Sequence, residues 1–227
     1  MTASARIDSP TPGSLRLVLT LAVAGLISGI AIIGIYEGTL PTITANKARE
    51  LREAVFKVLP GVSQMQSLAF RDGMLIATAE PSADESVVYG GYDDDGKFVG
   101  YAIPGAGPGF QDTIGLLYGF DATRRQVLGM EVLESRETPG LGDKIYKDLD
   151  FVGNFHGLSV DPTIVAVKKG AKTRPNEVDT ITGATISSKA VVRIINETHL
   201  VWSDKLAAPG EEPPLAETNS AASGEQR

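Results

Sequence analysis

A polar turn at residues 179–185, with the sequence Asp-Thr-Ile-Thr-Gly-Ala-Thr, is the first candidate for chemistry in this chain. It precedes a stretch with helical apolar spacing, and the first amide groups of a helix have no partners within that helix. These amides and the helix dipole attract anions, and Gly183 lets a phosphate come close to the backbone. A plain capping turn, in which Asp179, Thr182 or Thr185 accepts hydrogen bonds from the same amides, is the alternative.

The second candidate is the loop at residues 137–144, Glu-Thr-Pro-Gly-Leu-Gly-Asp-Lys, in which a Pro-Gly turn is followed by another glycine. Thr138 and the neighbouring amides could hydrogen-bond a flat heteroaromatic ring, and Leu141 could cover one of its faces. An ordinary connection after a strand is the alternative. The sequence provides no self-contained route from Thr185 to a phosphoester, because a threonine hydroxyl is a poor nucleophile without an activating base.

Other kinds of site are excluded or disfavoured. Residues 91–97 copy the spacing of a P-loop, but Phe98 stands where Ser or Thr should bind magnesium, so a hairpin tip is favoured. The chain has no cysteine, which excludes disulfides and iron–sulfur ligation by its own side chains. His156 and His199 are the only histidines, which excludes a histidine-rich metal site. A formal net charge of -7 gives no electrostatic basis for binding nucleic acid.

An apolar, uncharged run occupies residues 17–36, about the ~20 residues that a helix needs to cross a membrane. It is longer than the roughly 7–15 residues of a signal-peptide core, and no convincing cleavage site follows it. We therefore expect a membrane anchor, preceded by a short N-terminal cytoplasmic segment at residues 1–16. Gly25 and Gly29 have the spacing that lets a second helix approach in lipid. Basic residues flank the run on both sides, so charge alone does not determine its direction.

The elements that must position the two motifs follow the anchor. An amphipathic helix is expected at residues 42–59, after Pro41, and another helix at residues 186–201. Polar connectors at residues 93–96 and 121–124 indicate antiparallel hairpins. Apolar-rich segments between turn residues predict strands at residues 74–79, 87–92, 98–103, 113–120, 127–133 and 163–167.

These patterns predict an α+β fold with a mainly antiparallel sheet and flanking helices, formed by one domain at residues 37–205. The C-terminal residues 206–227 are rich in Pro, Gly, Ser and Glu. They contain too little apolar surface to offset the entropy of ordering, so we expect a disordered tail.

The two motifs together resemble those of one family, the FMN-binding G subunit of the Rnf electron-transport complex, which is related to the C subunit of the sodium-pumping NADH:quinone reductase. The family signature Asp-x-x-[Ser/Thr]-Gly-Ala-Thr matches residues 179–185, and its Glu-Thr-Pro-Gly-Leu-Gly loop matches residues 137–142. The order of the motifs and the N-terminal anchor match as well. The resemblance covers roughly residues 17–205, and Thr182 stands where many relatives have Ser.

The resemblance implies that Thr185 carries FMN through a phosphoester bond, which a separate flavin transferase makes by taking FMN from FAD. Gly183 and Ala184 would shape the turn around the phosphate. Asp179 and Thr182 would belong to the motif that the transferase recognises.

The loop at residues 137–142 has its own role in this resemblance. Glu137, Thr138, Gly140 and Leu141 would line the isoalloxazine ring of the flavin.

The resemblance also implies a place in the cell and a set of partners. The domain would lie on the periplasmic face of a bacterial inner membrane and relay electrons as a carrier rather than a complete enzyme. Its partners would be the other membrane and iron–sulfur subunits of an ion-translocating ferredoxin:NAD⁺ oxidoreductase. Two alternatives stay open: the FMN-carrying subunit of the sodium-pumping quinone reductase, and a non-redox, membrane-anchored assembly module in which residues 182–185 only cap a helix.

Overall fold

The computed structural model describes residues 13–79, 82 and 85–216. The chain divides into two compact units, residues 1–49 and residues 50–227, which are described separately below. Most of the predicted N-terminal segment at residues 1–16 lies outside the described residues, as does the end of the predicted tail, residues 217–227.

Helix α1 (Ser14–Val58) runs through Pro41 without interruption. The sequence predicted two helices that separate at this proline, and that prediction was wrong. A proline inside a helix removes one backbone hydrogen bond, and the residues on both sides continue the helix despite this loss. Among the described residues, α1 is the one helix that is long and apolar enough to cross a membrane, by its length and composition. Its most apolar 18-residue window has a mean hydropathy of 2.5 and contains no buried residue.

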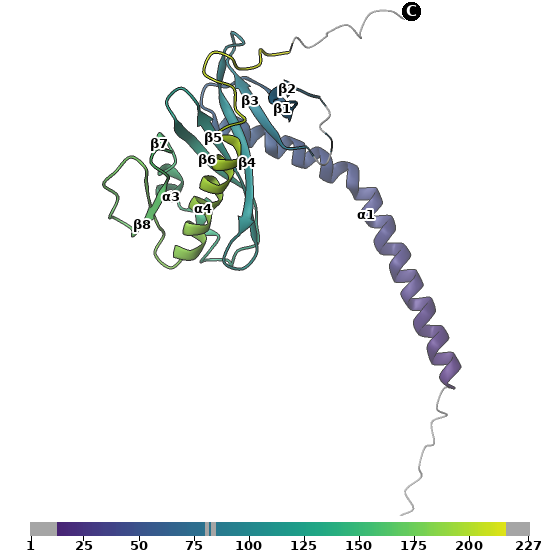
Figure 1. The fold of residues 1–227 in the computed structure, drawn as a ribbon. Helices are drawn as coiled ribbons and strands as arrows, with labels where there is room; N and C mark the ends of the chain where they lie inside the picture. Colours follow the sequence, from purple (N-terminus) through teal and green to yellow (C-terminus); the bar gives the residue numbers. More distant parts are fainter. Residues whose placement is uncertain (1–12, 80–81, 83–84, 217–227) are drawn as a thin grey trace, which may run out of the picture. The chain divides into compact units, whose positions relative to one another are not determined.

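Seven antiparallel strands form the sheet of the second unit, in the order β2-β1-β3-β4-β5-β6-β7 (Figure 1). The predicted hairpins at residues 93–96 and 121–124 are confirmed, because they join the antiparallel pairs β3–β4 and β5–β6. The bounds of the strands are β1 (Gln64–Arg71), β2 (Met74–Ala77), β3 (Val87–Tyr92), β4 (Phe98–Pro108), β5 (Thr113–Asp121), β6 (Gln126–Ser135) and β7 (Leu158–Ser159).

The remaining elements follow the central hairpins along the chain. Two short helices come directly after the loop at residues 137–143, namely α2 (Lys144–Lys147) and α3 (Leu149–Gly153). A small parallel pair, β8 (Val165–Val167) and β9 (Glu177–Asp179), precedes the last helix, α4 (Thr185–Trp202). The predicted α+β class is therefore confirmed: a mainly antiparallel sheet with helices beside it.

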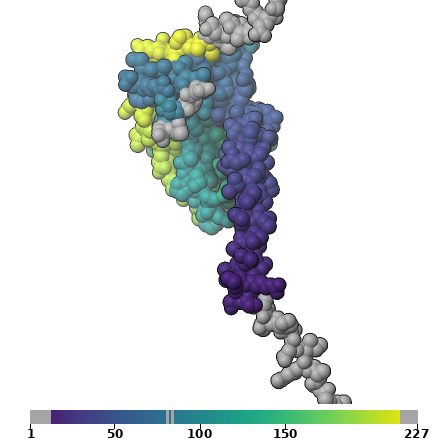
Figure 2. Space-filling model, turned by 90° about the vertical axis from the view of Figure 1, so that its right-hand side faces the viewer, coloured from purple at the N-terminus to yellow at the C-terminus, as the bar shows by residue number. Residues whose placement is uncertain are grey.

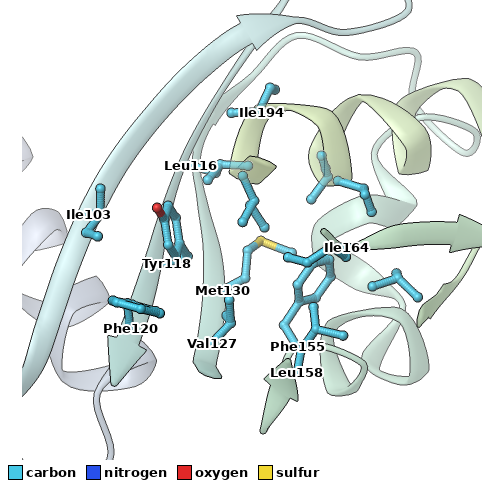
Figure 3. Close-up of a cluster of buried hydrophobic side chains, with 14 of the residues drawn as sticks. Ile103, Leu116, Tyr118, Phe120, Val127, Met130, Phe155, Leu158, Ile164 and Ile194 are labelled. Carbon is cyan, nitrogen blue, oxygen red and sulfur yellow. The ribbon is translucent and has the colours of Figure 1, made fainter. Parts of the chain in front are cut away.

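The main core lies between the sheet and α4, which crosses one of its faces (Figure 1). Leu116 and Met130 of the central strands meet Ile194 of α4 in this core (Figure 3). Phe155 and Ile164, from the segments between α3 and β8, close the same cluster. This packing fixes where α4 lies on the sheet, and so where its first residue is placed.

The last turns of α1 belong to the second unit and cover the opposite face of the sheet. Val55 and Val58 are buried there together with Ala102 and Leu117. These two strand residues are next to Ile103 and Leu116 in the chain, and side chains alternate between faces along a strand. The sheet is therefore buried on both faces.

Part of the predicted disordered tail lies against the sheet, which differs from the expectation. The hydroxyl of Tyr92 donates a 2.6 Å hydrogen bond to the carbonyl oxygen of Pro213. The side-chain amide of Gln66 donates to the carbonyl oxygen of Pro214 at 2.9 Å and accepts from the amide of Ala216 at 2.9 Å. Figure 2 shows these C-terminal residues in yellow over the blue strands. Composition did not reveal these partners, because they lie 121 to 150 residues earlier in the chain.

Candidate functional site

An open cavity of about 310 Å³ lies where three segments meet: the loop after β4, the loop after β6 and the start of α4. Its walls are mostly apolar, and none of the described residues that line it carries a charge. The lining residues are Phe110, Thr138, Leu141, Gly142, Gly183, Ala184, Thr185, Ile186 and Ser187.

Thr185 is the first residue of α4, and its exposed side chain borders the cavity. Its hydroxyl donates a long hydrogen bond of 3.4 Å to the carbonyl oxygen of Ile181. The N-cap residue is Ala184, and no side chain of the described residues caps the helix. The amide groups of the first turn therefore remain available to an anion in the cavity.

Asp179 and Thr182 do not border the cavity. The carboxylate of Asp179 accepts hydrogen bonds from the amides of Ala171 and Lys172, at 3.2 Å each. Asp179 thus closes the loop between β8 and β9, and Thr182 is exposed on the turn before α4. The capping alternative, in which these side chains would satisfy the start of α4, is not what the structure shows.

Two glycines give the turns around the cavity their shape. Gly183 has a φ of 84° and Gly140 a φ of 79°, both in the left-handed region that side chains with a Cβ rarely adopt. Gly183 borders the cavity directly, whereas Gly140 lies in the neighbouring Pro-Gly turn and does not. At both positions a turn depends on the absence of a side chain.

The loop after β6 contributes a polar and an apolar group to the cavity. The hydroxyl of Thr138 donates a 2.7 Å hydrogen bond to the side chain of Gln111, which ties this loop to the loop after β4. Leu141 is 50% exposed and Phe110, on the loop after β4, is 62% exposed. These exposed apolar side chains give the cavity an apolar rim that a flat aromatic ring could use.

Glu137 lies behind the cavity wall instead of lining it, and is only 5% exposed. One carboxylate oxygen accepts 2.9 Å hydrogen bonds from the amides of Phe110 and Gln111, and the other accepts a 2.5 Å bond from Ser187. Burial acts to raise the pKa of Glu137, but these hydrogen bonds outweigh it and hold the pKa below its ordinary value. The group is therefore ionised at neutral pH.

The structure brings together one part of the predicted site and separates another. Thr138, Leu141, Gly183, Ala184 and Thr185 border the same cavity, although Leu141 and Gly183 are 42 residues apart in the chain. The other predicted residues, Glu137, Gly140, Asp179 and Thr182, lie in the surrounding turns.

Three lining residues were missed from the sequence: Phe110, Ile186 and Ser187. Phe110 lies in a Gly-Pro-Gly-Phe segment that carries no recognisable motif, and Ile186 and Ser187 were assigned to the helix alone. Gly142 also borders the cavity, and it belongs to the loop at residues 137–142 that the resemblance placed at the flavin ring. The position of Phe110 depends on the hydrogen bonds to Glu137, which sequence patterns do not reveal.

Comparison with known proteins agrees with the position of the cavity. Residues 109–199 match the model of the FMN-binding domain family, and every residue that lines the cavity falls within this range. The crystal structure of NqrC from Shewanella oneidensis has the same fold, with a TM-score of 0.53 and 20% sequence identity, covering 67% of this chain and 91% of that one.

Two relatives are similar over most of their length. The G subunit of the Na⁺-translocating ferredoxin:NAD⁺ oxidoreductase complex of Acetobacterium woodii is 30% identical, covering 83% of this chain and 91% of that protein. The G subunit of the ion-translocating oxidoreductase complex of Escherichia coli K12 is 35% identical, covering 70% of this chain and 77% of that protein. The chain belongs to the family formed by the G subunits of the ion-translocating oxidoreductase complexes, the Rnf family.

Proposed function

We propose that this chain is the electron-transfer subunit of an ion-translocating ferredoxin:NAD⁺ oxidoreductase complex and carries FMN covalently bound to Thr185. The observation that carries the proposal is the position of the Thr185 hydroxyl, at the uncapped start of α4 and on the border of an apolar cavity. The match of residues 109–199 to the FMN-binding domain family supports the choice of flavin.

The groups around the cavity fit the two ends of FMN. The free amides of the first turn of α4 suit the phosphate, and Gly183 lets the phosphate approach the backbone. Leu141 and Phe110 offer apolar surface for the ring, and Thr138 offers a hydroxyl at the same border. The bound flavin supplies reversible electron uptake, and the protein's part is to hold it and to set its surroundings.

Covalent attachment of FMN requires a phosphoester bond to Thr185, and the chain needs another protein to form it. A bond forms between Thr185 Oγ1 and the phosphorus of FMN, the pyrophosphate bond of FAD breaks, the hydroxyl proton is lost and AMP leaves. The described residues that line the cavity include no His, Asp, Glu or Lys that could serve as the base. We infer that a separate flavin transferase provides the activation, with Asp179 and Thr182 in the segment that it recognises.

The covalent bond is tested by mass and fluorescence on full-length protein from cells that contain a flavin transferase. We expect an increment equal to FMN less water on the peptide that holds Thr185, and a fluorescent band on a denaturing gel. Thr185→Ala should lose both signals, whereas Thr185→Ser, which retains a hydroxyl, should keep a flavin. Wild-type protein without flavin under these conditions would refute the proposal, and so would retention of flavin by Thr185→Ala.

The location and partners are part of the same proposal. The apolar window of α1 supports a single pass through the inner membrane. We propose that the FMN domain, at residues 37–205, lies on its periplasmic side. An accessibility assay on intact cells, with a cysteine introduced at Lys97, tests this orientation because the chain has no other cysteine. Co-purification of an iron–sulfur-rich subunit would support the ferredoxin:NAD⁺ complex over the sodium-pumping quinone reductase.

A further inference from the structure

Glu137 is a buried carboxylate that has no cationic partner in the part of the chain that the structure describes. Its side chain forms no ion pair with any Lys, Arg or His of the described residues, although a buried charge is normally paired. Its charge is balanced by dipoles instead: the amides of Phe110 and Gln111 on one oxygen and the hydroxyl of Ser187 on the other. A buried charge that is held only by dipoles directly behind a cavity wall indicates a role at the cavity in addition to packing.

These hydrogen bonds join all three segments that form the cavity. Phe110 belongs to the loop after β4, Glu137 begins the loop after β6, and Ser187 lies in the first turn of α4, two residues after Thr185. Each segment is thereby tied to the same carboxylate within 2.9 Å. Loss of the carboxylate would release the three walls from one another.

The space around the carboxylate is filled, so that its orientation is fixed. A Cβ added at Gly142 would lie 2.7 Å from Cβ of Glu137 and 3.0 Å from Oγ of Ser187. A Cβ added at Gly109 would collide with Oε1 of Glu137. The glycines on both sides therefore leave room for the carboxylate and for little else.

The charge of Glu137 acts on whatever occupies the cavity. A carboxylate that is 5% exposed is poorly screened by water, so its field reaches the adjoining space more strongly than that of a surface carboxylate. A negative charge behind the wall disfavours the addition of an electron to a ring in the cavity.

We propose that Glu137 is a positioning residue for the flavin, which fixes the three walls of the cavity and opposes flavin reduction through its negative charge. This inference rests on the proposed function. Glu137 would act through its neighbours and its electric field, in place of the direct contact with the ring that the resemblance implied.

Glu137→Gln separates charge from shape, because glutamine is nearly isosteric and can still accept hydrogen bonds from the two amides. In the flavin-loaded full-length protein, we expect the midpoint potential to become more positive, with the ratio of reduced to oxidised flavin at a fixed ambient potential rising on the order of ten-fold. The matched control is Glu177→Gln. Glu177 also accepts hydrogen bonds from backbone amides, those of Thr173 and Arg174, but belongs to β9 and does not border the cavity.

The result for the control decides between a local and a general effect. An unchanged potential in Glu177→Gln, together with a positive shift in Glu137→Gln, supports the inference. An unchanged potential in Glu137→Gln, or an equal shift in both variants, would overturn it.

The positioning role has a readout that needs no flavin. The background for this measurement is the full-length Thr185→Ala variant, which cannot attach flavin. In this background we expect slow hydrogen exchange at the amides of Phe110 and Gln111. Adding Ser187→Ala or Glu137→Ala should raise the exchange rate of these amides by at least ten-fold. Ser187→Ala keeps the charge and removes one donor, so it also serves if Glu137→Ala does not fold. Unchanged exchange in Ser187→Ala and in any folded Glu137→Ala would overturn the positioning role. Failure of the wild type to acquire flavin would count only against the proposed function.

Discussion

The hydroxyl of Ser187 donates a 2.5 Å hydrogen bond to the carboxylate of Glu137, which lies 50 residues earlier in the chain. This bond links the first turn of α4 to the loop after β6, and both residues are buried. Hydrogen bonds to a charged group are shorter and about twice as strong as neutral ones. The loop motif is thus joined by a direct contact to the helix that begins with Thr185, in addition to the cavity that the two motifs share.

The stability of the protein should depend on the ionisation of Glu137. Its pKa is held below the usual 4.5 in the folded state, so the ionised carboxylate stabilises the fold above that pH. This contribution is lost as the pH falls through the lowered pKa. We expect the free energy of unfolding of detergent-solubilised protein to fall less steeply below about pH 4.5 in Glu137→Gln than in the wild type.

Urea titrations between pH 7 and pH 3 measure this difference. The shifted groups Asp143 and Glu177 are present in both proteins, so the comparison isolates Glu137. Equal slopes in the two proteins would contradict the prediction.

Gly183→Ala should destabilise the fold and impair flavin attachment. The left-handed conformation at φ 84° costs a residue with a Cβ about 1–2 kcal/mol, and relief of that strain would distort the turn before Thr185. The matched control is Gly153→Ala in α3, where an added Cβ also meets nothing within 4 Å but φ is not positive. Thermal unfolding and the fraction of flavin-bearing protein measure the two effects, and equal behaviour of the two variants would contradict this account.

Tyr92→Phe should loosen the C-terminal residues from the sheet. Burial is the main cause that raises the pKa of Tyr92 to about 12, so its hydroxyl remains a donor to Pro213 at neutral pH. Removal of this hydrogen bond should speed limited proteolysis within residues 207–216. Tyr89→Phe, on the same strand, is the control because the Tyr89 hydroxyl forms no hydrogen bond with the described residues. Equal cleavage rates in wild type and Tyr92→Phe would show that the hydroxyl does not hold the tail.

The strands with regular apolar patterns could be predicted from the sequence, and others could not. Val87–Tyr92 was predicted with its observed bounds, and the hairpin turns at residues 93–96 and 121–124 carry the usual turn residues. Strand β1 was missed because Gln64, Gln66 and Ser67 break its apolar pattern, and its pairing with β3 stabilises it instead. The two residues of β7 are too few to show a period.

The two motifs that border the cavity could be predicted from the sequence, but the contacts that hold the cavity together could not. Thr185, Gly183 and Leu141 belong to short signatures with recognisable chemistry. The position of Glu137 behind the wall depends on donors at residues 110, 111 and 187, and contacts between such distant residues are set by the packing of the whole sheet and α4. Local spacing therefore indicated several residues that border the cavity, but it did not reveal the donors that Glu137 contacts.

The distance along the chain between the walls of the cavity has a consequence for maturation. Phe110, Thr138 and Thr185 come together only after the β5–β6 hairpin has formed and α4 has docked on the sheet. A synthetic peptide that spans residues 179–187 would contain the signature residues but would lack the other cavity walls and the hydrogen bond to Glu137. Folding must therefore precede the assembly of this cavity.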